Sequence, residues 1–175
     1  MKNFWKLVLS CVGTVVIMFA VFNTTKQDNQ VPMPGTHRYI KMVDAISDKY
    51  KVDRLLVHHI VNVAVIESND KNIDPTLTLA IIATESGFNP HAYNPSSASG
   101  LMQVMMNIHS KLIQSLGGSV FDPTTNIKAG LNILDFFMRL TGNEDVALNK
   151  YGGDPTGQYS QKVKQNKQWL KEYEL

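Results

Sequence analysis

The fold of this chain is decided by residues 74–87, which read DPTLTLAIIATESG. Asp74 can cap a helix, and Pro75 suits the first helical position, where its missing N–H costs no hydrogen bond. A nearly unbroken apolar run follows, and Gly87 can end the helix. We therefore predict a buried helix whose last turn carries Glu85.

Glu85 shares its helix face with residues that belong to a core. Counting back by the helical period places it in line with Thr78, Ile81 and Ile82. Burial disfavours a carboxylate and the negative end of the helix dipole repels it, so both raise the pKa above its usual value of about 4.3. Such a group can donate a proton and later take it back. A glutamate that faces solvent at a helix end is the ordinary alternative.

The dipeptide Glu-Ser occurs twice in the chain. Glu67-Ser68 ends a different apolar helix and leads into the polar stretch Asn69-Asp70-Lys71-Asn72, which has the composition of a turn. We interpret Glu67 as the surface end of a helix, and Glu85 as the candidate acid.

Composition and periodicity indicate one helical domain. The chain has 175 residues, of which 43% are hydrophobic and 18% charged, enough for one globular domain with an N-terminal extension. A net charge of +2 without a basic run excludes a nucleic-acid partner. Every periodic segment after residue 36 has helical spacing, and no alternating run is long enough for a strand. We predict an all-α domain over residues 37–175.

The N-terminal extension has two parts. Residues 1–22 carry Lys2 and Lys6 before an apolar run, which is typical of a secretory signal or an uncleaved membrane anchor. No small-x-small cleavage site follows, which favours an inner-membrane anchor with a cytoplasmic N-terminus and a periplasmic domain. Residues 23–36 are polar and contain proline and glycine, as in a linker.

A set of motifs resembles the lytic transglycosylases of the lysozyme-like, soluble-transglycosylase (SLT) family. Glu85-Ser86 and Gly100-Leu101-Met102-Gln103 have the spacing of that family's catalytic segment. Further matching pieces follow in the same order: Phe121-Asp122-Pro123, Asn126-Ile127, Ala129-Gly130, Ala147 to Gly153, and Tyr159 with Val163. Each piece is weak alone, but the set is specific and covers roughly half of the chain. The resemblance implies a lysozyme-like helical fold and an enzyme that cleaves peptidoglycan in the bacterial envelope.

The resemblance also implies a reaction that consumes no water. Glu85 would protonate the bond between N-acetylmuramic acid and N-acetylglucosamine, the substrate's acetamido group would stabilise the positive charge, and Glu85 would deprotonate the C6 hydroxyl to close a 1,6-anhydro ring. A second carboxylate is hard to find, since Asp74, Asp122 and Asp154 each have a capping or turn role. A water-using muramidase and a non-catalytic peptidoglycan-binding scaffold of an envelope-spanning assembly stay open as alternatives.

The resemblance assigns roles to individual residues. Tyr151 is expected beside the acid, where its hydroxyl can orient Glu85, although a partly buried tyrosine at a helix end needs no such role. The Met102 thioether is expected to pack on a sugar. The substrate-binding residues that the resemblance implies are Ser86, Asn94, Gly100, Leu101, Met102, Gln103 and Tyr159.

Two positions depart from the family pattern. Gly152 stands where asparagine is common after the tyrosine, and Asn94 stands where a serine is common nine residues beyond the acid. We expect no metal and no cofactor, because His58, His59 and His109 lack the spacing of zinc ligands.

Overall fold

The computed structural model describes residues 39–174, and the predicted anchor and linker lie outside the described residues. The described residues form seven helices and two very short strands. None of these helices is both long enough and apolar enough to cross a membrane. In chain order the elements are α2 (Ile40–Tyr50), α3 (Arg54–Asn69), α4 (Pro75–Glu85), β1 (Ala98–Ser99), β2 (Val104–Met105), α5 (Met106–Leu116), α6 (Pro123–Thr141), α7 (Glu144–Tyr151) and α8 (Gln158–Lys171).

Aspartate caps begin three of the helices, as the sequence predicts. Asp53 accepts hydrogen bonds from the first backbone N–H groups of α3, Asp74 does so for α4, and Asp122 for α6. Proline follows the cap in α4 and α6. Each cap satisfies an N–H group that has no partner inside the helix, which is worth about 1 kcal/mol.

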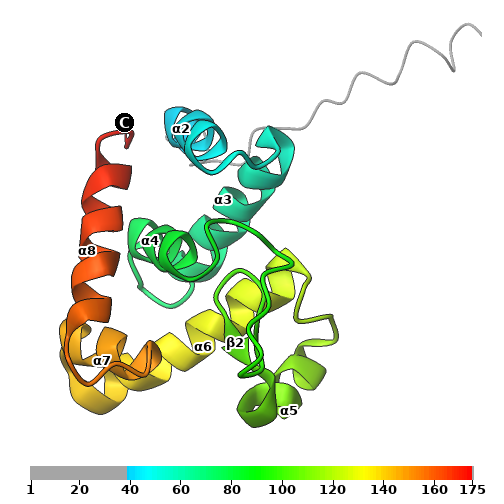
Figure 1. Cartoon of the computed structure of the whole chain (residues 1–175), viewed down its shortest axis with the longest axis vertical. Helices are drawn as coiled ribbons and strands as arrows, with labels where there is room; N and C mark the ends of the chain where they lie inside the picture. Colours follow the sequence, from blue (N-terminus) through cyan, green and yellow to red (C-terminus); the bar gives the residue numbers. More distant parts are fainter. Residues whose placement is uncertain (1–38, 175) are drawn as a thin grey trace, which may run out of the picture. The chain divides into compact units, whose positions relative to one another are not determined.

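Helix α4 lies in the middle of the helical domain. It packs on α3 and most extensively on α8, which runs beside it in Figure 1. All residues from Thr76 to Ala83 are buried, so the helix has core on every side. Glu85 stands where this helix leaves the core.

Helix α6 joins the remaining elements. It packs on α3, α7 and α5, and in Figure 1 it crosses the lower part of the domain as the long yellow helix. A smaller hydrophobic cluster, separate from the main core, lies between α5, α6 and strand β2; its buried members are Val104, Ile113, Val120 and Ala129.

The two strands correct the expectation that the domain contains helices alone. β1 and β2 pair in antiparallel fashion, with Ala98 opposite Met105 and Ser99 opposite Val104. Each strand has two residues, which is too short for an alternating pattern to show in the sequence. The turn that joins the two strands is Gly100–Gln103, so the Gly-Leu-Met-Gln motif forms the tip of a hairpin.

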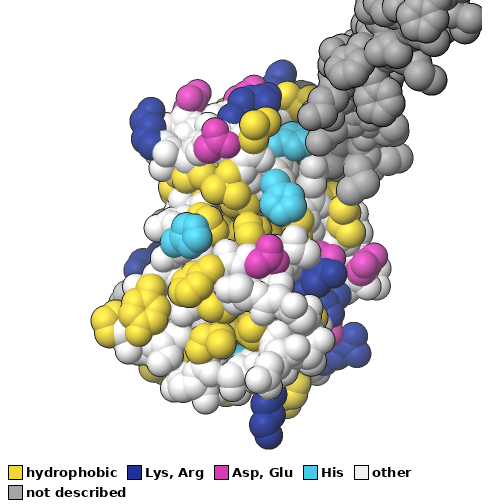
Figure 2. All heavy atoms as spheres, turned by 90° about the vertical axis from the view of Figure 1, so that its right-hand side faces the viewer, with side chains coloured by type: hydrophobic (Ala, Val, Ile, Leu, Met, Phe, Trp, Pro, Cys, Tyr) yellow, Lys and Arg dark blue, Asp and Glu magenta, His cyan; other side chains and the backbone are white. Residues whose placement is uncertain are grey.

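The charged side chains are dispersed on the face of the domain that Figure 2 shows. On the face that Figure 2 shows, basic and acidic side chains of the described residues alternate with hydrophobic ones and form no continuous basic stripe. This distribution agrees with the small net charge of the chain.

Candidate active site

The carboxyl group of Glu85 is mostly buried at the wall of a groove. The hydroxyl of Tyr159, from the first turn of α8, donates a hydrogen bond to Glu85 Oε1 at 2.6 Å. Burial raises the pKa of Glu85, and the hydrogen bond from Tyr159 opposes it with a smaller effect. Glu85 therefore holds its proton more tightly than an exposed glutamate does, as a general acid requires.

Two tyrosines lie near Glu85, and they have different partners. Tyr151 donates its hydroxyl to the carbonyl oxygen of Met102 at 2.8 Å, and its ring centroid lies 6.5 Å from that of Tyr159. Tyr151 was expected to orient Glu85 through its hydroxyl, but its one proton goes to the carbonyl of Met102 and not to the acid. Tyr159, which we expected to contact substrate, holds the acid instead. Burial first, and the Glu85 charge second, raise the pKa of both phenols, so both stay neutral donors.

Asn126 of α6 holds the hairpin turn from below. Its side-chain amide donates to the carbonyls of Ser99 at 2.9 Å and Val120 at 2.7 Å, and its Oδ1 accepts from the N–H of Met102 at 2.7 Å. A Cβ on Gly100 would lie 2.5 Å from the Val120 carbonyl oxygen and also against the Asn126 amide, so only glycine fits there. In the sequence, Asn126 was used only for its place in the order of the motifs. A side-chain amide on the buried face of an apolar helix nevertheless indicates a residue that makes hydrogen bonds inside the protein.

Leu101 and Met102 lie inside the protein and not in the groove. Both side chains are 0% exposed, and the Met102 side chain packs against Gly130 of α6. The expectation that the Met102 thioether packs on a sugar is therefore wrong for this structure, because core residues enclose the side chain. The N–H and the carbonyl of Met102 are also engaged, by Asn126 and Tyr151. These two residues support the groove from behind.

The groove itself has a volume of about 360 Å³. Glu85 is the only carboxylate among the described residues that line it. Besides Glu85, the lining includes the predicted site residues Asn94, Gln103 and Tyr151. It also includes Gly152, which we had noted only as a departure from the family pattern, and Ser96, Ile108, His109, Ile133, Phe137 and Lys150, which we had not assigned to the site.

The polar side chains of the groove also shape its loops. Gln103 Nε2 donates to the carbonyls of Ala92 and Gly100, and Asn94 Oδ1 accepts from the N–H and the hydroxyl of Ser96. Ser86 is not among the residues that line the groove, since its hydroxyl donates to the Ile82 carbonyl inside α4. The predicted site residues therefore have different places. Some line the groove, some hydrogen-bond within its loops, and Ser86 bonds to the backbone of its own helix.

The family of the chain follows from a match over most of its length. The family model described as "Transglycosylase SLT domain" matches residues 62–173, which contain all the groove residues named above. The chain belongs to the SLT transglycosylase family.

Individual relatives agree with this family. The membrane-bound lytic murein transglycosylase C of Salmonella typhi is 34% identical over 125 residues, which are 66% of this chain and 29% of that protein. The protein of the same name from Yersinia pestis is 36% identical over 89 residues, which are 45% of this chain and 25% of its own. The chain thus spans less than a third of the length of these curated relatives.

A solved structure shows the same fold. The 70-kDa soluble lytic transglycosylase, in its complex with bulgecin A, superposes with a TM-score of 0.50 at 22% sequence identity. The match covers 73% of this chain and 21% of that chain. The domain is thus an SLT-type helical domain in its fold as well as in its sequence.

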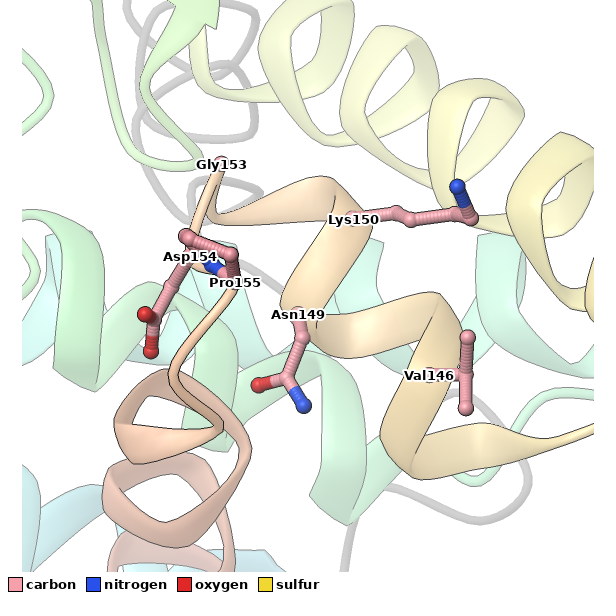
Figure 3. A pocket seen from close by; sticks show the side chains of 6 residues that line it. All are labelled: Val146, Asn149, Lys150, Gly153, Asp154 and Pro155. Atoms are coloured by element: carbon pink, nitrogen blue, oxygen red, sulfur yellow. The ribbon is translucent and has the colours of Figure 1, made fainter.

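A second pocket is lined by residues of the last turns of α7 and of the loop that follows it (Figure 3). In it, Asn149 and Asp154 point toward the start of α8: Asn149 Oδ1 accepts from the N–H of Ser160 at 2.9 Å, and Asp154 Oδ2 from that of Tyr159 at 2.7 Å. Hydrogen bonds, that of the Thr156 side chain first, lower the pKa of Asp154. Asp154 therefore serves as a cap and does not line the groove of Glu85.

The histidines of the described residues form no metal site. Among residues 39–174, no three His, Cys, Asp or Glu side chains are placed to hold a metal ion. His109 lines the groove, at a kink in α5, and burial lowers its pKa, which favours the neutral imidazole.

Proposed function

We propose that this domain is a peptidoglycan lytic transglycosylase, a lyase that cleaves the bond between N-acetylmuramic acid and N-acetylglucosamine without water. The observation that carries the proposal is that Glu85 is the single carboxylate among the described lining residues of the groove; it is mostly buried and is held by a phenol. Family membership and relatives named lytic murein transglycosylases support the same substrate.

The first step is protonation of the leaving group. Because Tyr159 donates to Oε1, Oε2 is the oxygen that carries the transferable proton. Glu85 gives this proton to the glycosidic oxygen, the bond to C1 of the muramic acid breaks, and the N-acetylglucosamine leaves with a hydroxyl. The acetamido group of the substrate stabilises the positive charge at C1. Tyr159 stabilises the carboxylate that forms, since its hydrogen bond favours the charged form.

The second step returns the proton. The C6 hydroxyl oxygen attacks C1 of the same sugar, and the Glu85 carboxylate takes the hydroxyl proton, which closes a 1,6-anhydro ring and restores the acid. Hydrolysis by two carboxylates needs a second carboxyl group about 5 Å from the first in a retaining enzyme and about 6.5 to 9.5 Å away in an inverting one. The described lining residues of the groove offer none.

The identity of the products tests the proposal. We expect mass spectrometry of digested peptidoglycan to show muropeptides that end in 1,6-anhydro-N-acetylmuramic acid, lighter by one water than muramidase products. Digestion in heavy-oxygen water should leave these ends unlabelled. Reducing ends that carry heavy oxygen would identify a muramidase, and no soluble product would favour a wall-binding scaffold.

We also propose that the domain works in the periplasm, held at the inner membrane by residues 1–22. The lysine-flanked apolar run of this segment and the membrane-bound relatives support the location. An envelope-spanning assembly, for which a small anchored enzyme opens the wall locally, is the partner we propose. Full-length protein recovered from the cytosol would contradict the location, as would a domain inaccessible to protease added from the periplasmic side.

A further inference from the structure

We propose that Gly152 is a positioning residue, whose missing side chain makes the room in which the ring of Tyr159 reaches Glu85. The kinetic consequence of this role rests on the function proposed above, while its structural part rests on the geometry at the end of α7.

Two adjacent glycines follow α7, and they differ in what requires them. Gly153 has φ of 63°, in the left-handed region, and a Cβ built on it would meet no atom within 4 Å. Gly152 has φ of −76° and ψ of −1°, which any residue adopts. A Cβ on Gly152, however, would lie 2.7 Å from Cε2 of Tyr159 and closer still to its Cγ and Cδ2. Backbone conformation explains Gly153, whereas only lack of space explains Gly152.

The backbone that carries Tyr159 has little freedom to move aside. Its own N–H is bound by Asp154, and the next N–H, of Ser160, is bound by Asn149 of α7 (Figure 3). These bonds tie the start of α8 to the end of α7, so the helix cannot simply retreat from a larger residue at position 152. A new Cβ must therefore displace the ring, and the ring carries the hydroxyl that lies 2.6 Å from Glu85.

Loss of this contact has a defined chemical effect on the acid. The Tyr159 hydroxyl lowers the pKa of Glu85 against the larger effect of burial. A displaced ring should therefore let the pKa of Glu85 rise further. The same reasoning gives an unexpected result for Gly152→Asn: asparagine is the residue that the family resemblance suggests here, yet its Cβ would meet Tyr159 just as that of alanine does.

Carbon-13 NMR titration of the Glu85 carboxyl tests the proposal without any activity. We expect Gly152→Ala and Gly152→Asn to raise the pKa of Glu85 as Tyr159→Phe does, and the double variant Gly152→Ala/Tyr159→Phe to raise it no further, because both changes act through one hydrogen bond. Gly153→Ala, the matched control, should leave the titration unchanged. A folded Gly152→Ala protein with the parent's Glu85 titration would overturn the proposal.

Thermal unfolding supplies a second test that holds even if Gly152→Ala folds poorly. Tyr159→Ala removes all three ring atoms that a Cβ at position 152 would meet. Gly152→Ala should therefore lower the melting temperature of the parent but not that of the Tyr159→Ala variant, whereas Gly153→Ala should lower both equally, since its strain is in the backbone. An equal loss from Gly152→Ala in both backgrounds would refute the steric role. A parent that leaves peptidoglycan intact would refute the proposed function and leave both tests in force.

Discussion

The two Glu-Ser dipeptides of this domain are alike in sequence and in local structure, but their surroundings differ. Glu67 and Glu85 both lie in the last turn of an apolar helix. Glu67 meets the ammonium of Lys128, on α6, at 3.3 Å, whereas Glu85 meets the hydroxyl of Tyr159 at 2.6 Å. Glu67 is thus part of an ion pair, whereas burial raises the pKa of Glu85 and favours a proton that can be given away.

The serines of the two dipeptides also differ, but here the residue of the first dipeptide makes the contact with another helix. The hydroxyl of Ser68 is buried and lies 2.8 Å from that of Thr78 on α4, so it joins two helices. The hydroxyl of Ser86 returns to the Ile82 carbonyl of its own helix. Identical local sequence therefore gives one dipeptide a structural role and the other a place at the groove, because the tertiary partner decides.

The largest expected effect separates the two glutamates by activity. Glu85→Gln should reduce release of soluble muropeptides from purified peptidoglycan by ~10²- to 10⁴-fold, since the amide keeps the shape of the side chain but has no proton to donate. Glu67→Gln should cleave as the parent does. Equal activity of the Glu85→Gln and parent proteins would remove Glu85 from the mechanism and abolish the contrast.

A smaller effect should follow when the partner of each glutamate is substituted and the glutamate itself is kept. Tyr159→Phe removes a hydrogen bond to a group that becomes charged, worth roughly 1.5 to 3 kcal/mol, so kcat should fall roughly 10- to 100-fold. Because that bond lowers the pKa of Glu85, the alkaline limb of the pH–rate profile should move to higher pH. Lys128→Met removes the partner of Glu67 and should change neither quantity. A pH–rate profile that stays in place in Tyr159→Phe would contradict the role of the phenol.

Stability against pH sharpens the comparison further. The pKa of Glu85 is raised in the folded protein, so the parent loses stability as pH rises from the unfolded-state pKa through the folded one. Glutamine does not titrate. The gain in the free energy of unfolding of Glu85→Gln over the parent should therefore be near zero below pH of about 4. At higher pH this gain should reach about 1.4 kcal/mol for each unit by which the pKa of Glu85 differs between the folded and unfolded states. Urea unfolding at several pH values measures this. Glu67→Gln should instead cost up to about 1 kcal/mol at neutral pH, through loss of its ion pair; a gain of the same size in both variants would contradict the contrast.

The last expected effect concerns the serines, and here the first dipeptide should be the more sensitive one. Ser68→Ala should lower the free energy of unfolding by about 1 to 2 kcal/mol because it leaves the buried Thr78 hydroxyl without its partner. Ser86→Ala should cost less, since its hydroxyl bond lies within one helix. The double variant Ser68→Ala/Thr78→Val should recover part of the loss, because it removes both hydroxyls. A larger loss from Ser86→Ala than from Ser68→Ala in chemical denaturation would show that the assignment is wrong.

Helices and their caps could be predicted from the sequence because their causes are local. Asp53, Asp74 and Asp122 cap as expected, and the apolar run after Pro75 forms the buried helix that carries Glu85. The hairpin was missed because strands of two residues show no pattern of their own, and Asn126, which holds them, is 24 positions from Met102 and 27 from Ser99. The surface position expected for Glu67 was likewise only partly right, since Lys128 packs beside it and leaves its side chain 18% exposed.

The acid and a few of the groove-lining residues, such as Asn94 and Gln103, could be expected, but the partners of the tyrosines could not. The motif order placed both Tyr151 and Tyr159 near the site, yet which hydroxyl reaches Glu85 depends on how the start of α8 is fixed against α7. The prediction for Met102 was wrong for a similar reason. A methionine in a loop that begins with glycine looks exposed in the sequence, whereas the hydrogen bond from its N–H to Asn126 holds the turn so that its side chain lies in the core.

The bracing of the hairpin turn separates the part of the groove that tolerates change from the part that does not. Asn126 and Tyr151 together occupy the N–H and the carbonyl of Met102, so Met102 cannot move without loss of a hydrogen bond. The lip of the groove differs, since Asn94, Ile108 and Lys150 are exposed and lie outside this bracket. Substitutions at the lip can therefore alter the shape and polarity of the groove one side chain at a time, while the frame that presents Glu85 stays the same.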